Sequence, residues 1–182
     1  MQALPTPQAQ PDPLPLPQPQ PQLPRDTLLG IVEHTPLVSI DLICHRPGGE
    51  VLLGWRHNRP AQASWFVPGG RIRKGERVAQ ALRRIASVEL GLDADALPPV
   101  TFLRAWEHLY DDNFAGAPGI GTHYVVLAYQ LTLDEAQAAT LQPDAQHGEL
   151  RWFAPDALLA DPQVHVNSRA YFDTGIDATR IP

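Results

Sequence analysis

The clearest pattern of apolar and polar positions lies just before the middle of the chain and predicts an amphipathic helix. Ala81, Ile85 and Val88 follow at spacings of four and three, so they would share one side of that helix. Glu89 falls on the edge of the same side, and Gly91 ends the run as a glycine after a helix commonly does. The pattern alone is typical of a surface helix packed on a sheet.

The apolar positions before this helix predict a β-hairpin. Val38, Ile40, Leu42 and Cys44 alternate with more polar residues, as expected for a strand with one buried face. The sequence PGGE at 47–50 then makes a turn into VLLGW, a second strand. Upstream of the hairpin, residues 26–34 (DTLLGIVEH) predict a short helix capped by Asp26. The amphipathic helix described above is expected to begin at Gly75 and Glu76.

Further elements are predicted after the helix. They are two strands at 100–114 and 122–133, a strand at 149–153 and short helices within 154–162 and 166–172. The loop at 111–121 is rich in glycine and contains Asp111 and Asp112. Adjacent carboxylates in such a loop suggest a metal site, but a solvated loop accounts for them better.

The first 25 residues differ in composition from the rest. They consist mostly of Pro, Gln and Leu, which favour extended polyproline II and supply too little apolar surface to pack, so a disordered tail is predicted. The tail has neither a basic start nor a continuous apolar stretch, so it does not resemble a secretory signal. It could bind a Pro-recognising domain or be passive, and no residue in it identifies a partner.

Composition narrows the function of residues 26–182, which suit one domain. The net charge of −6 argues against a nucleic-acid partner, and no stretch approaches the roughly 20 apolar residues that span a bilayer. Cys44 is the single cysteine, so an internal disulfide is excluded and a reducing, cytoplasmic compartment is expected.

Residues 69–92, GGRIRKGERVAQALRRIASVELGL, resemble the Nudix box. That motif has Gly, five residues, Glu, seven residues, and then Arg-Glu-apolar-any-Glu-Glu-any-Gly-apolar. The matching residues are Gly70, Glu76, Arg84, Ala86, Glu89, Gly91 and Leu92. Ile85 and Val88 stand where the motif has carboxylates. In the family those carboxylates share one helical face and hold divalent cations, so this chain should hold fewer metal ions.

The lack of carboxylates at these two positions resembles one branch of the superfamily, the GDP-mannose mannosyl hydrolases. The likeness to that branch extends from about residue 26 to residue 173. The strings that carry it are TPLVSIDLI, LLGWRHNRPAQASWFVPGGR, HLYDDNF, THYVVL, PDAQHGELRWF and VHVNSRAYF, in that order. The resemblance implies an α+β, α/β/α sandwich of the Nudix fold, with a mixed central sheet and the box helix packed on it. It also implies a homodimer formed with help from the N-terminal helix, which could instead pack on its own domain.

The resemblance assigns roles to ten residues. One Mg²⁺, or alternatively Mn²⁺, would be held by the Gly69 carbonyl, Glu89 and Gln146, and the general base would be His147. A diphosphate would be neutralised by Arg56, Arg71 and Arg84. The sugar and the leaving group would be positioned by Asp41, His108 and Tyr124. Several of these residues could instead have purely structural roles. Arg84 could pair with Glu76, and a lone loop histidine such as His147 is usually inert.

The activity that follows is Mg²⁺-dependent hydrolysis of GDP-mannose, and of GDP-glucose, to GDP and free sugar with inversion at the anomeric carbon. A diphosphate is already a good leaving group, so one metal ion and a few arginines suffice for its charge. A neutral histidine is suited to activating water near neutral pH. Two alternatives remain: a conventional Nudix nucleotide-sugar diphosphatase that attacks phosphorus, and a non-catalytic nucleotide-sugar binding module.

Overall fold

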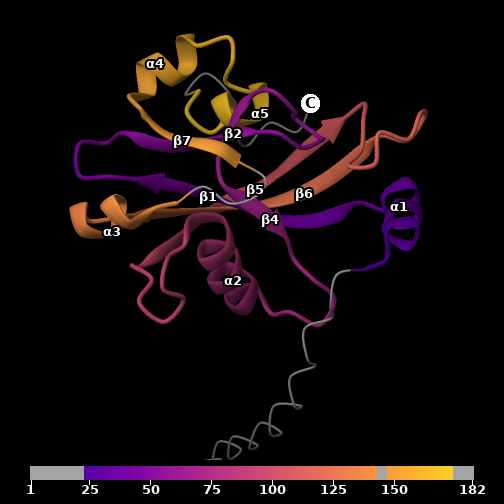
Figure 1. Cartoon of the computed structure of the whole chain (residues 1–182), viewed down its shortest axis with the longest axis horizontal. Coiled ribbons are helices and arrows are strands. Elements are labelled where there is room, and N and C mark those ends of the chain that lie inside the picture. The colour runs from indigo at the N-terminus through magenta and orange to yellow at the C-terminus, as the bar shows by residue number, and fades with distance from the viewer. Residues whose placement is uncertain (1–22, 143–146, 174–182) are drawn as a thin grey trace, which may run out of the picture.

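The chain forms one mixed β-sheet covered by helices on both faces (Figure 1). The computed structural model describes residues 23–142 and 147–173, and of His147 only the backbone. The elements are α1 (Arg25–His34), β1 (Leu37–His45), β2 (Val51–Arg56), β3 (Trp65–Phe66), β4 (Gly69–Arg71), α2 (Val78–Leu90), β5 (Val100–Tyr110), β6 (Thr122–Thr132), α3 (Glu135–Thr140), β7 (His147–Phe153), α4 (Pro155–Ala160) and α5 (Val166–Ala170).

Strand β1 lies in the middle of the sheet and places the residues that matter later. The strand order is β3-β2-β1-β6-β5, with β4 paired to β1 and β7 paired to β2. Strand β6 runs parallel to β1, whereas β4 is antiparallel to it, with Asp41 opposite Gly69. The predicted α+β class and the mixed sheet with the helix packed on it are confirmed.

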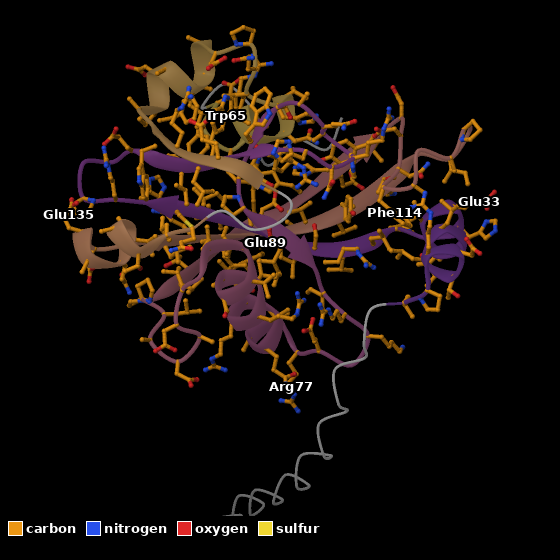
Figure 2. All side chains as sticks on the ribbon, viewed as in Figure 1. Glu33, Trp65, Arg77, Glu89, Phe114 and Glu135 are labelled. Carbon is orange, nitrogen blue, oxygen red and sulfur yellow. The ribbon has the colours of Figure 1, made fainter. Side chains whose placement is uncertain are left out.

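Two apolar cores hold the helices on the sheet. On one face α2 packs through Ala81, Ile85 and Leu90 against the buried side chains of β1. On the other face α4 and α5 cover a second core that includes Trp65. Figure 2 shows this arrangement, with Glu89 where α2 meets the sheet and Trp65 on the opposite side. Burial of each large apolar side chain contributes about 1.5–3 kcal/mol, so both layers are well fixed.

The predicted helix over the box is confirmed, with two corrections. It begins at Val78 rather than at Gly75, because Gly75 adopts a turn with φ of 85°. Val88 was expected on the packed side, but its side chain is 54% exposed and lines a cavity. The end is as predicted: Gly91 adopts the left-handed conformation at φ 70°, and its N–H donates to the Ser87 carbonyl.

Other predicted elements agree with the structure except at their edges. The hairpin of β1 and β2 is present, but the two strands pair only next to the turn, at His45 and Val51. Asp26 does not cap α1, since Pro24 holds the N-cap position and Asp26 lies in the first turn. Helix α3 was not predicted, although Asp134 caps it by accepting from the Gln137 N–H. Within the described residues no helix combines the length and the apolar character that crossing a membrane requires.

Candidate active site

Strands β1, β4, β5 and β6 and helix α2 surround a cavity of about 700 Å³. Eight of the ten predicted site residues line it: Asp41, Arg56, Gly69, Arg71, Arg84, Glu89, His108 and Tyr124. They come from positions up to 83 residues apart (41 to 124), so the sheet is what brings them together. Among the described side chains that line this cavity, seven are Arg or Lys and only two, Asp41 and Glu89, are acidic. In a chain of net charge −6 this is a cationic site, suited to a polyanionic ligand.

The backbone of β4 approaches β1 closely at the floor of the cavity. A Cβ added at Gly69 would lie 2.5 Å from Asp41 Oδ1 and 2.7 Å from the Ile40 carbonyl oxygen, closer than real Cβ atoms come. Glycine is therefore required here by the contact itself. At Gly70 an added Cβ would lie 3.3 Å from Ile85 Cγ1 on α2. The Gly-Gly pair thus fits between a strand and a helix.

Asp41 and His108 are both buried, and the hydroxyl of Tyr171 lies between them. Tyr171, just after α5, donates its hydroxyl hydrogen bond to Asp41 Oδ2 at 2.7 Å, and the same hydroxyl lies 3.3 Å from His108 Nε2. Burial raises the pKa of Asp41 to about 7, partly offset by the Tyr171 hydrogen bond and the Arg56 charge. Burial, reinforced by the nearby His165, lowers the pKa of His108 to about 4. His108 is therefore neutral at physiological pH.

Glu89 is the one box carboxylate on the inner side of α2, and it is buried at the cavity. Its Oε1 lies 3.9 Å from a Cβ added at Gly70, so its carboxylate lies next to the β4 backbone. Ile85, in the place of a second carboxylate, is fully buried in the α2 core. Among the described residues no group of three His, Cys, Asp or Glu side chains is placed to hold a metal ion. A metal here would depend on Glu89 and on backbone oxygens such as that of Gly69.

Arg84 makes a structural ion pair. Its Nε lies 2.5 Å from Glu76 Oε1, and its Nη2 donates to Glu76 Oε2 and to the Arg71 carbonyl, each at 2.8 Å. Glu76 also accepts from the Arg73 N–H, at 2.7 Å. The hydrogen bond from Arg84 holds the pKa of Glu76 below its usual range. Of the two roles considered for Arg84, the structure shows this pairing, while the guanidinium also borders the cavity.

Arg56, Arg71 and Tyr124 form the polar wall. Arg56 donates from Nε to the Pro60 carbonyl at 3.2 Å, and its Cζ lies 5.7 Å from the centre of the Phe66 ring. Burial lowers the pKa of the Arg71 guanidinium and raises that of the Tyr124 hydroxyl. Both side chains are thus partly desolvated, which strengthens their interaction with a bound anion.

Two predicted residues cannot be placed as side chains. Gln146 lies outside the described residues, and only the backbone of His147 is described. That backbone starts β7, where His147 pairs with Arg56 of β2. Asp112, considered above for a metal site, instead pairs with Arg59 at 3.0 Å. The sequence reasoning did not single out Tyr171, because a tyrosine at the end of a short helix carries no periodic or spacing signal.

Comparison with known proteins connects this geometry to a family. The model of the NUDIX domain matches residues 35–174. The low-salt glycan biosynthesis protein Agl8 of Haloferax volcanii is 42% identical over 135 residues, which cover 74% of this chain and 81% of that protein.

Solved structures resemble the fold at lower identity. The MutT protein of Methanosarcina mazei Go1 matches with a TM-score of 0.61 at 17% identity, covering 76% of this chain and 92% of that one. The NUDIX domain of Shewanella oneidensis NrtR, crystallised with ADP ribose, matches with a TM-score of 0.58 at 17% identity, covering 82% and 95%. These two likenesses concern the fold, and together with the family model they confirm the predicted Nudix fold.

Proposed function

The chain belongs to the NUDIX domain family, and on that premise we propose that it hydrolyses GDP-mannose and GDP-glucose to GDP and free sugar. The family and the cavity support a hydrolase acting on a nucleotide-linked substrate. The choice of sugar nucleotide rests on the resemblance of the strings between residues 26 and 173 to GDP-mannose mannosyl hydrolases. The 42% identical relative is named for glycan biosynthesis, a process that uses nucleotide sugars as donors.

The cationic lining is the observation that carries the proposal. Seven Arg and Lys side chains against two carboxylates favour a ligand with several negative charges, and a diphosphate has them. Arg56 and Arg71 both line the cavity, and among the described residues neither makes an ion pair with a carboxylate as Arg84 and Arg59 do. They are two of the cations available to neutralise a departing diphosphate.

Attack at carbon rather than phosphorus is supported by the two altered box positions. Ile85 is buried in the α2 core and Val88 is an apolar, exposed residue at the cavity, so neither offers an oxygen ligand. Hydrolysis at phosphorus in this family depends on several carboxylate-held metal ions. A single retained carboxylate, Glu89, fits a reaction in which the protein only has to stabilise a good leaving group.

The residues present fit one divalent cation. The Glu89 carboxylate and the Gly69 carbonyl are hard oxygen donors at the cavity, of the kind that Mg²⁺ prefers, with substrate phosphates completing its shell. Gln146 would be the third protein ligand. When bound, Mg²⁺ would neutralise charge on the diphosphate.

In the proposed reaction the protein supplies the general base and the groups that orient the substrate. A water molecule attacks the anomeric carbon and His147 accepts its proton, while the bond from that carbon to the diphosphate oxygen breaks and GDP leaves as an anion. Attack from the side opposite the leaving group inverts the configuration at carbon. The backbone pairing of His147 with Arg56 in the sheet supports this arrangement, since the proposed base and a proposed diphosphate-binding arginine are cross-strand neighbours. Asp41, His108 and Tyr124 would orient the sugar and leaving group.

Product analysis tests the proposal. GDP-mannose is incubated with the protein and Mg²⁺ in ¹⁸O-labelled water, and the products are identified by mass spectrometry. GDP with label in free mannose is expected. GMP and mannose 1-phosphate with label on phosphorus would replace the proposal by diphosphatase action, and tight binding without turnover would indicate a binding module.

The base is tested by substitution. His147→Gln should lower kcat by about 10²–10⁴-fold with little change in KM. His34→Gln, at an exposed histidine on α1, serves as the matched control and should leave kcat unchanged. An unchanged kcat in His147→Gln would remove His147 from the reaction.

A further inference from the structure

The hydroxyl of Tyr171 lies between two residues of the cavity that come from different strands. It is 2.7 Å from Asp41 Oδ2 on β1 and 3.3 Å from His108 Nε2 on β5, across 130 and 63 positions of sequence. We infer that Tyr171 is a positioning residue, which fixes the Asp41 carboxylate and the tautomer of His108 for the substrate. The inference rests on the proposed function only for what Asp41 and His108 then do.

The number of protons available determines the direction of the hydrogen bonds. An ionised carboxylate only accepts, so when Asp41 is ionised the single hydroxyl proton of Tyr171 points to it as the nearer partner. The tyrosine oxygen then has only lone pairs to offer His108, and Nε2 must carry a proton to bond with it. A neutral imidazole has one N–H, so Nδ1 of His108 becomes its acceptor nitrogen. Tyr171 thereby sets which nitrogen of a cavity-lining histidine can accept from a substrate hydroxyl.

Packing holds Tyr171 in this place independently of its hydroxyl. Its ring lies edge-on to Trp106, with centroids 5.0 Å apart, and tilted against the His108 ring at 5.8 Å. One turn earlier, the buried Ser168 Oγ accepts from the Val67 N–H at 3.1 Å, which ties α5 to the chain just before the Gly-Gly pair. A phenylalanine at 171 would keep the ring contacts and lose only the two hydrogen bonds.

The backbone of β4 limits the space around Asp41. A Cβ added at Gly69 would lie 2.5 Å from Asp41 Oδ1, so little room is left on that side of the carboxylate, while Oδ2 accepts from Tyr171. Loss of the Tyr171 hydroxyl would remove the hydrogen bond to Oδ2 and leave only this close packing to orient the carboxylate.

The direct test uses the substrate-free, metal-free protein. Long-range ¹H–¹⁵N NMR at alkaline pH should show His108 as the Nε2–H tautomer, and Tyr171→Phe should give a mixture of tautomers. Tyr129→Phe is the matched control, because Tyr129 packs on Phe102 elsewhere on the sheet, and it should leave the His108 signals unchanged. An Nδ1–H tautomer in the wild type, or an unchanged tautomer in Tyr171→Phe, would overturn the inference. Thermal melting confirms that each variant is folded.

Kinetics with GDP-mannose then test the consequence. Tyr171→Phe should lower kcat by about ten- to a hundredfold, the range for losing a hydrogen bond to a charged group, with KM nearly unchanged. In single-turnover assays the same substitution in an Asp41→Asn background should cost less than about twofold, because the partner is already altered. Additive losses would indicate a merely structural role and refute the inference. If the wild type does not hydrolyse GDP-mannose, the proposed function fails, whereas the NMR result still decides on the hydrogen bonds.

Discussion

The ion pair between Glu76 and Arg84 gives a sharp prediction for stability. The carboxylate meets two guanidinium nitrogens, at 2.5 and 2.8 Å, and also accepts from the Arg73 N–H at 2.7 Å. The side chain of Glu76 is 2% exposed and that of Arg84 is 22% exposed. Glu76→Gln removes the negative charge, nearly preserves the shape and leaves the guanidinium without its counter-charge.

Removing one partner of a buried ion pair costs about 3–5 kcal/mol. Arg84 retains some contact with water and its bond to the Arg71 carbonyl, so the lower end of that range applies, about 3 kcal/mol. The effect must depend on pH. Because Arg84 lowers the pKa of folded Glu76, the stabilisation is present above the ordinary value of 4.5 and is lost as pH falls through the folded pKa. Wild type and variant should therefore converge in acid.

Urea unfolding of both proteins, without divalent cations, at neutral and at acid pH measures these differences. Glu50→Gln is the matched control, since Glu50 pairs with Arg46 at the surface, with 31% and 34% of the two side chains exposed. That substitution should cost at most about 1 kcal/mol. If Glu76→Gln costs no more than Glu50→Gln, or if the difference from wild type does not narrow in acid, the reasoning is refuted.

Three further outcomes follow from single contacts. Gly69→Ala should lower both the melting temperature and metal-dependent activity, because its Cβ would press on the Asp41 carboxylate and the Ile40 carbonyl; an unchanged melting curve would contradict this. Gly30→Ala, in α1 with nothing within 4 Å of the added Cβ, should raise the free energy of unfolding by about 0.5–1 kcal/mol in denaturant titrations. The pKa of His108 is about 4 in the folded protein and 6.5 ordinarily, so between these values the unfolded chain binds more protons. The free energy of unfolding of the wild type should therefore decrease as the pH is lowered from 6.5 to 4. His108→Asn should therefore lose up to about 3 kcal/mol less than wild type across that window, as measured by unfolding at each end of it.

The parts of the fold that sequence predicted are those fixed by local pattern. Helix α2 has its apolar residues at helical spacing and a glycine at its end, and the apolar residues of β1 alternate along the sequence, so both elements appear where expected. The expectation of a single buried face was wrong for β1, because this central strand is covered on both faces, with Ser39 and Asp41 buried and Val38 exposed. Residues at the edges of these patterns were harder to place. Val88 lies at helical spacing from Ile85, yet α2 meets the sheet through Ile85 and Glu89 and leaves Val88 at the cavity. Which edge of a helical face is covered depends on the angle of packing, and spacing alone does not give it.

The residues of the site were predicted from the family resemblance and not from local sequence patterns. Asp41, Arg56, His108 and Tyr124 lie on separate strands, and nothing local connects them; the family resemblance supplied the connection, and the sheet register places all four at one cavity. The contacts of Tyr171 could not be predicted in this way, because its partners are brought to it only by tertiary packing. A hydroxyl that bridges residues 130 and 63 positions away has no signature in sequence.

The altered box separates two functions that the motif usually combines. The structural residues of the motif are present and have clear contacts. Gly70 packs against Ile85, Glu76 and Arg84 form the buried ion pair, and Gly91 ends the helix. Of the three positions on α2 where the motif has carboxylates for metal ions, only position 89 has one in this chain. Ile85 belongs to the apolar core, where an ionised carboxylate would need a partner or a cation to offset its desolvation. On the proposed function, α2 would serve mainly as a support apart from Glu89, and most of the charges for the reaction would come from the sheet, where Arg56, Arg71, Asp41 and His108 line the cavity.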